Sequence, residues 1–178
     1  MEIIKRLFVG GDEQYEKVKD KPGWSWLRAA KYGPGGHQQT LNYHTLAAPP
    51  GKDYLWVRRG NLFAMNLIDV DDPAFIPDEL LRKGLEFINE RMNAGDKVFV
   101  GCNSGHSRGP TMAFLYLRTI GELDQPFNRA KHIFKTIYPP FDEGSGMEFH
   151  ARRLWDELKG IYAITRRTGS TPSATSVR

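Results

Sequence analysis

The chain has 178 residues, a formal net charge of +4 and one cysteine. This length suits a single domain whose core is large enough to fold without cross-links, and one cysteine excludes an intramolecular disulfide. No apolar run approaches the roughly 18–20 residues that span a bilayer, and the N-terminus lacks the pattern of a secretory signal. These features predict a cytoplasmic protein that does not act at a membrane.

The positive charge gathers near the C-terminus. Residues 165–178 contain three arginines and no acid, which leaves a charge of only +1 for the rest of the chain. The small polar residues around these arginines are typical of disorder. We therefore expect one domain over residues 1–164, a disordered basic tail over 165–178, and no nucleic-acid partner.

Apolar patterning predicts strands and helices that alternate along the chain. A strand is expected from Ile3 to Val9 and a helix from near Asp12, whereas residues 24–51 are irregular and rich in glycine and proline. An irregular segment of that length is often functional. Further strands are expected at Tyr54 to Arg58, Asn61 to Ile68 and Val98 to Val100, and helices at Asp78 to Met92, Thr111 to Ile120, Phe127 to Ile137 and Met147 to Leu158. The pattern predicts an α/β fold with a central, mostly parallel sheet flanked by helices.

The cysteine stands in the most informative segment of the chain. An apolar strand leads into Cys102, Arg108 follows six positions later, and a helical pattern starts at Pro110. Such a loop can turn its backbone N–H groups inward to hold an anion, and the helix N-terminus and the arginine add positive charge. Gly105 suits the left-handed turn that the loop needs. The pattern predicts a sulfur nucleophile beneath a bound oxyanion and disfavours the alternative of a buried, inert cysteine.

Three acids precede this segment. Asp69, Asp71 and Asp72 follow an apolar strand and come before the helix that leads to the cysteine strand. A phosphate-transfer site needs a general acid for the leaving oxygen and then a base for water. Alternation along the strand favours Asp72, then Asp71, with Asp69 as the third candidate. At least two of the three are expected to be turn or cap residues.

A metal-dependent phosphatase is the alternative that the sequence supports less well. A strand that runs into Asp-x-Asp also begins the haloacid-dehalogenase-type phosphatases, which use an aspartate nucleophile and Mg²⁺. No clear later lysine and paired-acid motifs accompany it in this chain. The histidines lack the spacing of metal ligands, and no Cys-x-x-Cys pair occurs. No metal and no other cofactor is predicted.

The cysteine loop and the upstream acids together resemble the dual-specificity branch of the cysteine-dependent protein tyrosine phosphatases. The resemblance covers about residues 3–160 and includes a first strand that ends at Gly10-Gly11. A weaker similarity to small bacterial and phage-type members comes from Lys31, Pro34, His37 and Tyr43. The segment from Lys31 to His44 is a candidate substrate-recognition loop.

The resemblance implies a role for each matching residue. Cys102 would form a phosphocysteine intermediate, and Asp71 or Asp72 would protonate the leaving group and then activate water. The residues that would bind the phosphoryl oxygens are Asn103, Ser104, Gly105, His106, Ser107 and Arg108. The implied substrates are phosphorylated proteins or peptides, carrying phosphotyrosine or, where the cleft is shallow, phosphoserine and phosphothreonine.

Two positions depart from the family pattern. Gly101 stands where the family usually has histidine before the cysteine, and Gly109 stands where a serine or threonine usually follows the arginine. Ser104, Ser107 or Thr111 are candidates to replace that hydroxyl. The departures leave open a slow or non-catalytic phosphate-binding module. A relative that acts on nucleotide or RNA 5′-phosphates is a third hypothesis, and the near-neutral body of the chain disfavours it.

Overall fold

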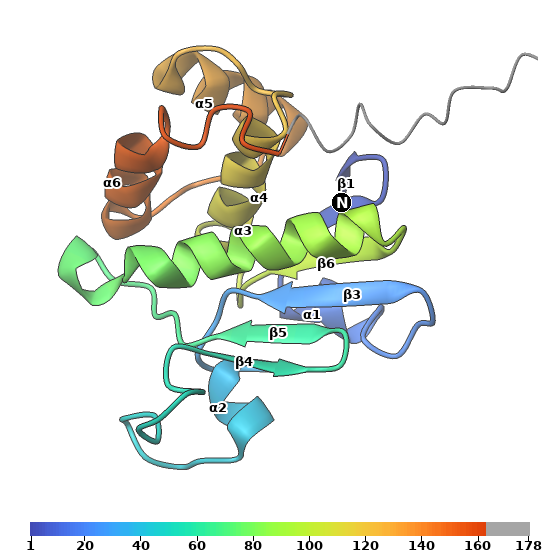
Figure 1. The fold of residues 1–178 in the computed structure, drawn as a ribbon, viewed down its shortest axis with the longest axis vertical. Coiled ribbons are helices and arrows are strands. Elements are labelled where there is room, and N and C mark those ends of the chain that lie inside the picture. Colours follow the sequence, from blue (N-terminus) through green and yellow to red (C-terminus); the bar gives the residue numbers. More distant parts are fainter. Residues whose placement is uncertain (163–178) are drawn as a thin grey trace, which may run out of the picture.

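Six strands form one mixed sheet in the computed structural model, which describes residues 1–162 (Figure 1). The strands lie in the order β1-β2-β6-β3-β5-β4. Their bounds are Glu2–Ile4 for β1, Leu7–Gly10 for β2, Trp24–Arg28 for β3, Trp56–Arg59 for β4, Leu62–Met65 for β5 and Lys97–Gly101 for β6. The four inner strands are parallel to one another, and both edge strands are antiparallel to their neighbours. The predicted α/β class with a mostly parallel sheet is confirmed.

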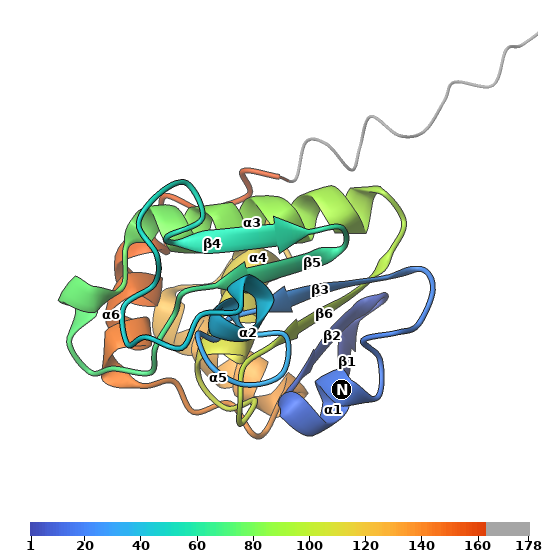
Figure 2. The same cartoon turned by 90° about the horizontal axis from the view of Figure 1, so that it is seen from below.

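Helices cover both faces of this sheet (Figure 2). On one face lie α3 (Asp78–Asn93) and α4 (Arg108–Thr119), with α5 (Phe127–Ile137) and α6 (Ser145–Leu154) packed outside α4. The short helices α1 (Asp12–Glu16) and α2 (His37–Leu41) lie on the other face. No helix of residues 1–162 is both long enough and apolar enough to cross a membrane.

Alternating side chains of the strands divide the core in two. Val98 and Val100 of β6 join the large cluster beneath α3 and α4, whereas Phe99 between them joins a smaller cluster with Tyr15 and Trp24. This period of two is what a strand covered on both faces requires. The predicted domain boundary at residue 164 and the predicted tail lie outside the described residues.

The expectation of an irregular segment over residues 24–51 is wrong in its first part, because β3 lies in the middle of the sheet. Two buried polar residues, Ser25 and Arg28, obscured the strand pattern. The Ser25 hydroxyl donates to the Asp96 carboxylate and accepts a hydrogen bond of 2.9 Å from Nε of Arg91. Both partners are distant in sequence. A buried polar side chain is tolerated when it is hydrogen-bonded, and sequence periodicity does not show such partners.

Several other boundaries differ from the expectation, among them the end of β5, expected at Ile68, and both ends of α6, expected at Met147 and Leu158. The strand expected from Ile3 to Val9 is a hairpin, because the chain turns at Arg6 with a φ of 70°. Helix α4 begins at Arg108, ahead of the expected Thr111. Pro110 permits this earlier start because a proline within the first helical turn removes no intrahelical hydrogen bond. The start places Arg108 in the first turn, directly after the cysteine loop.

Candidate active site

The cysteine loop, residues 102–107, joins the end of β6 to the start of α4 at the carboxyl edge of the parallel strands. In an open α/β sheet this edge is where ligands usually bind. Cys102 is fully buried, and Gly105 has a φ of +77°. A Cβ atom at Gly105 would lie 2.7 Å from the Gly10 carbonyl carbon, so glycine is required here for space as well as for conformation.

Neighbouring segments hold the loop in place. The Asp12 N–H donates to the Asn103 carbonyl at 2.8 Å, and the Tyr138 hydroxyl donates to the Gly105 carbonyl at 2.9 Å. Burial raises the pKa of Tyr138, and the Coulombic effect of the nearby Cys102 sulfur acts in the same direction. The phenol therefore lies within electrostatic reach of the sulfur.

Arg108 is 6% exposed and is fixed at both of its terminal nitrogens. Its Nη1 donates to the Leu67 carbonyl at 3.0 Å, and its Nη2 donates to Asn103 Oδ1 at 2.9 Å. The buried Nε atom donates no hydrogen bond and lies 3.5 Å from Asp69 Oδ2. A buried donor without an acceptor typically costs about 1–3 kcal/mol, and a bound oxyanion would supply the acceptor.

The other loop residues predicted to bind phosphate occupy two kinds of position. Ser104 and His106 are exposed at the rim, and the Ser104 Oγ accepts from the His106 N–H at 3.3 Å. Ser107 is buried; its Oγ donates to Asp69 Oδ1 at 3.3 Å and accepts from the Gly144 N–H at 3.1 Å. Thr111 uses its hydroxyl to donate to the Ser107 carbonyl at 2.9 Å.

The three candidate acids make different contacts, and all three are exposed. Asp69 contacts Ser107 and forms an ion pair with Arg108. Asp71 Oδ1 accepts from the Ser145 hydroxyl at 2.7 Å. Asp72 caps the short helix η1 (Pro73–Phe75) by accepting from the Ala74 N–H at 2.9 Å. The roles predicted for Asp71 and Asp72 stay predictions.

The two glycines that depart from the family pattern are explained by space. A Cβ atom at Gly101 would lie 2.4 Å from Cε1 of Phe99 and 2.8 Å from the Gly10 carbonyl oxygen. A Cβ atom at Gly109 would lie 2.7 Å from the Gly101 carbonyl carbon and 2.8 Å from the Cys102 nitrogen. A side chain at 101 would have to displace the Phe99 ring as well as the Gly10 carbonyl, and a side chain at 109 would meet backbone atoms alone, so neither the histidine nor the hydroxyl residue fits this close packing of α4 against β6.

The segment from Lys31 to His44 reaches the loop at one point, where Asn103 Nδ2 donates to the Tyr32 carbonyl at 2.9 Å. Farther along, His37 is buried, and its ring nitrogens lie 3.1 Å from the Tyr43 hydroxyl and 2.7 Å from the Asp53 carbonyl. Burial lowers the pKa of His37. Its contacts show that His37 organises this segment; a role in recognising substrate stays a prediction.

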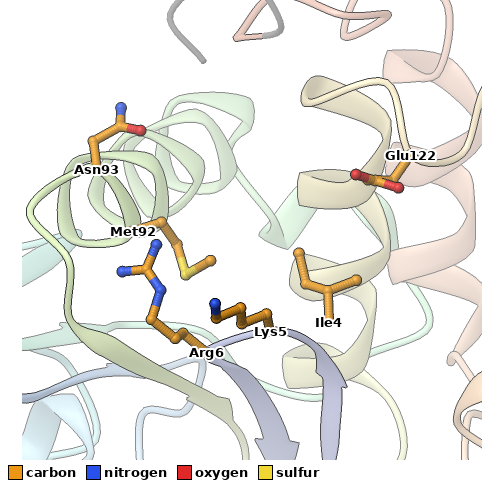
Figure 3. Close-up of a pocket in the computed structure, with 6 residues that line it drawn as sticks. All are labelled: Ile4, Lys5, Arg6, Met92, Asn93 and Glu122. Atoms are coloured by element: carbon orange, nitrogen blue, oxygen red, sulfur yellow. The ribbon is translucent and has the colours of Figure 1, made fainter. Parts of the chain in front are cut away.

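Two cavities differ in their relation to this loop. A cavity of about 490 Å³ lies between the β1–β2 turn and the end of α3, near the amino end of β2 and away from the cysteine loop (Figure 3). A smaller one, of about 300 Å³, lies against the loop and is lined in part by Ser104, His106 and Tyr138. Within residues 1–162, no group of three or more metal-ligating side chains is arranged to hold a metal ion.

Sequence reasoning missed three residues whose side chains contact the loop from outside it, Asp12, Arg28 and Tyr138. Asp12 directly follows Gly10-Gly11 at the end of β2, and that position was a usable signal. Arg28 ends β3 and donates to the Cys102 carbonyl at 3.2 Å. Nothing in the local pattern around Arg28 indicated that it would be buried.

Comparisons with known proteins support the fold alone. No protein-family model matches the sequence, and no match was found among curated proteins. Among solved structures, human tyrosine phosphatase-like serine/threonine/tyrosine-interacting protein is 17% identical, with 88% of this chain and 95% of that chain covered and a TM-score of 0.57. DUSP15 is 11% identical (96% and 96% covered, TM-score 0.59), and PTPMT1 is 15% identical (94% and 98% covered, TM-score 0.59). With its Cys-x5-Arg loop at the carboxyl edge of the sheet, the chain has the fold of the dual-specificity phosphatases.

Proposed function

We propose that this protein is a cysteine-dependent phosphatase that hydrolyses phosphate monoesters of proteins or peptides. One observation carries the proposal. The only cysteine is buried at the end of β6, and a buried arginine with an unbonded Nε donor starts the helix that follows its loop. These parts supply a sulfur nucleophile and fixed positive charge for the oxygens of a phosphoryl group.

In the first step, the Cys102 thiolate attacks phosphorus and forms a sulfur–phosphorus bond as the bond to the leaving oxygen breaks. Arg108 and the loop amides stabilise the charge on the three remaining oxygens. An aspartic acid donates its proton to the leaving oxygen, so that an alcohol or a phenol departs.

In the second step, the same aspartate takes a proton from water, and the water oxygen attacks phosphorus. The sulfur–phosphorus bond then breaks, which releases inorganic phosphate and restores the thiolate. The hydroxyl that relatives usually place after the arginine is replaced by Gly109, so we expect this step to be slow. Ser107 and Thr111 use their hydroxyls in bonds to Asp69 and to the Ser107 carbonyl.

We assign the general acid to Asp71. Its carboxylate contacts the hydroxyl of Ser145, which adjoins Gly144, and the Gly144 N–H donates to Ser107 of the cysteine loop. Asp69 is paired with Arg108, and Asp72 is held by its own helix cap. Asp71 is thus the acid near the loop that neither a cation nor a cap engages.

Asp71→Asn is expected to lower kcat on phenyl phosphate by about 10²–10⁴-fold, because expulsion of a poor leaving group needs a proton. The loss on p-nitrophenyl phosphate should be much smaller, since nitrophenolate leaves without one. Asp69→Asn and Asp72→Asn make the same chemical change on neighbouring residues and serve as matched controls. A leaving-group-dependent loss in either control, with none in Asp71→Asn, would transfer the role to that residue.

Turnover by the unaltered chain tests the function as a whole. We expect hydrolysis of p-nitrophenyl phosphate in the presence of EDTA, because every catalytic group in the proposal belongs to the protein. If hydrolysis requires added Mg²⁺, the thiol mechanism is wrong. If turnover is absent but phosphotyrosine peptides bind, the protein is a phosphate-binding module, the other function that the sequence left open.

A further inference from the structure

Arg28 is a fully buried arginine directly beneath the cysteine loop, at the end of the central strand β3. Its Nη1 donates to the Cys102 carbonyl at 3.2 Å, and its Nη2 forms an ion pair with Asp12. The guanidinium also lies 4.6 Å from the centre of the Tyr15 ring. A buried arginine needs a partner for its charge and acceptors for its donors. The Cys102 carbonyl and Asp12 hold the two terminal nitrogens in place, whereas the buried Nε atom donates no hydrogen bond.

The contacts continue from Arg28 to the phosphate-binding arginine. Asp12 accepts from Arg28 through Oδ1 and from Asn103 Nδ2 through Oδ2, the latter at 3.2 Å. Asn103 Oδ1 in turn accepts from Arg108 Nη2 at 2.9 Å. These contacts form one connected path of polar groups that starts at Arg28 and ends at Arg108.

This path lies where the family pattern is broken. Relatives usually have a histidine before the cysteine, which orders the loop, but the backbone of Gly10 and the ring of Phe99 leave no room for a side chain at Gly101. Arg28 approaches from the neighbouring strand instead. In the register of the sheet, Arg28 is paired with Gly101 itself.

We propose that Arg28 is a positioning residue that replaces the missing histidine: it fixes the Cys102 carbonyl and, through Asp12 and Asn103, the orientation of Arg108. This inference rests on the proposed phosphatase site and adds how that site is held without the usual histidine. Arg28 does not touch the substrate; it sets the geometry in which the loop receives an oxyanion.

Several charged or titratable groups of the described residues contact the loop or belong to it. They are Arg28 from β3, Asp12 from α1, Asp69 from the segment after β5, Arg108 from α4, Tyr138 from the end of α5 and His106 in the loop itself. Removing Arg28 leaves Asp12 without its cation, so the net charge beneath the loop becomes more negative. The thiolate is then less favoured.

The test compares Arg28→Met, which keeps an apolar stem without charge or donors, with the unaltered full-length chain. Tungstate affinity, measured by calorimetry, is expected to fall by about 10- to 100-fold. The pH profile of Cys102 alkylation by iodoacetamide is expected to move to higher pH. Arg28→Lys keeps the charge but cannot bond both partners, so it should restore the alkylation profile more than the tungstate affinity.

Arg118→Met is a matched control, because Arg118 lies in the last turn of α4, away from the cysteine loop. Arg118 is also buried, also donates to backbone carbonyls, and also lies over an aromatic ring, that of Trp155, at 4.7 Å. This control is expected to lose thermal stability while keeping tungstate affinity. If Arg28→Met does not fold, Asp12→Asn cuts the same path at a side chain that is 32% exposed, and it should weaken tungstate binding.

The outcomes separate the two proposals. If folded Arg28→Met binds tungstate as tightly as the unaltered chain, the role of Arg28 is overturned and the phosphatase proposal stands. If Arg28→Met does not fold, unchanged tungstate affinity in Asp12→Asn has the same meaning. Tungstate binding that depends on Arg28, in a chain that hydrolyses no phosphate ester, supports the positioning role and overturns the proposed catalysis. A chain that binds no tungstate overturns both.

Discussion

Replacing Cys102 with serine is expected to abolish phosphate-ester hydrolysis, lowering kcat by at least about 10³-fold. The substitution exchanges one buried atom for another of similar size, so the fold and the bonds around the loop should persist. A serine hydroxyl remains protonated at neutral pH and is a far weaker nucleophile than a thiolate. The measurement is steady-state hydrolysis of p-nitrophenyl phosphate in EDTA.

Two further readouts locate the loss in the chemical step. Tungstate affinity in Cys102→Ser should stay close to that of the unaltered chain, since Arg108 and the loop remain. Rapid denaturation of the unaltered chain in alkaline detergent, during turnover of ³²P-labelled substrate, should trap labelled phosphate on Cys102, and Cys102→Ser should trap none. Full turnover by Cys102→Ser would rule out a sulfur nucleophile and favour the alternative of an aspartate nucleophile.

The part of the site that sequence predicts well is the part contained in one segment. A strand, a glycine-bearing turn and a helix start follow one another within residues 97–119, so the local backbone alone brings Cys102, Gly105 and Arg108 together. Helices α3 and α5 were predicted to within a residue for the same reason: their apolar spacing is a property of the segment itself.

What sequence could not supply is the support that comes from elsewhere. Strand β3 was missed because its Arg28 and Ser25 are buried, and the acids that satisfy them lie on other elements. Alternation along a strand favours Asp72 among the acids, but β5 ends at Met65 and the chain enters η1 at Pro73, so the alternation does not hold at Asp72. A cap contact to Ala74 and a hydroxyl contact from Ser145 distinguish these acids only after folding.

Lysine in place of Arg108 is expected to lower kcat/KM by about 10³-fold, which corresponds to about 4 kcal/mol of transition-state stabilisation. The charge is kept, but the planar fork is lost. In the present geometry Nη1 and Nη2 are held by the Leu67 carbonyl and Asn103, whereas Nε makes no hydrogen bond and only faces Asp69 Oδ2 at 3.5 Å, so Nε is the donor that can turn to an oxygen of the phosphoryl group. A single ammonium group cannot hold both partners and still face the substrate.

Arg118→Lys is the control for this prediction, because it makes the same change at a buried arginine of the same helix that is remote from the loop. Both variants should lower the thermal unfolding temperature, since each leaves backbone carbonyls without a donor. Only Arg108→Lys should lower kcat/KM and tungstate affinity together. If the two variants lost activity equally, the loss would follow from stability. Arg108 would then not be the group that binds the transferred phosphoryl oxygens.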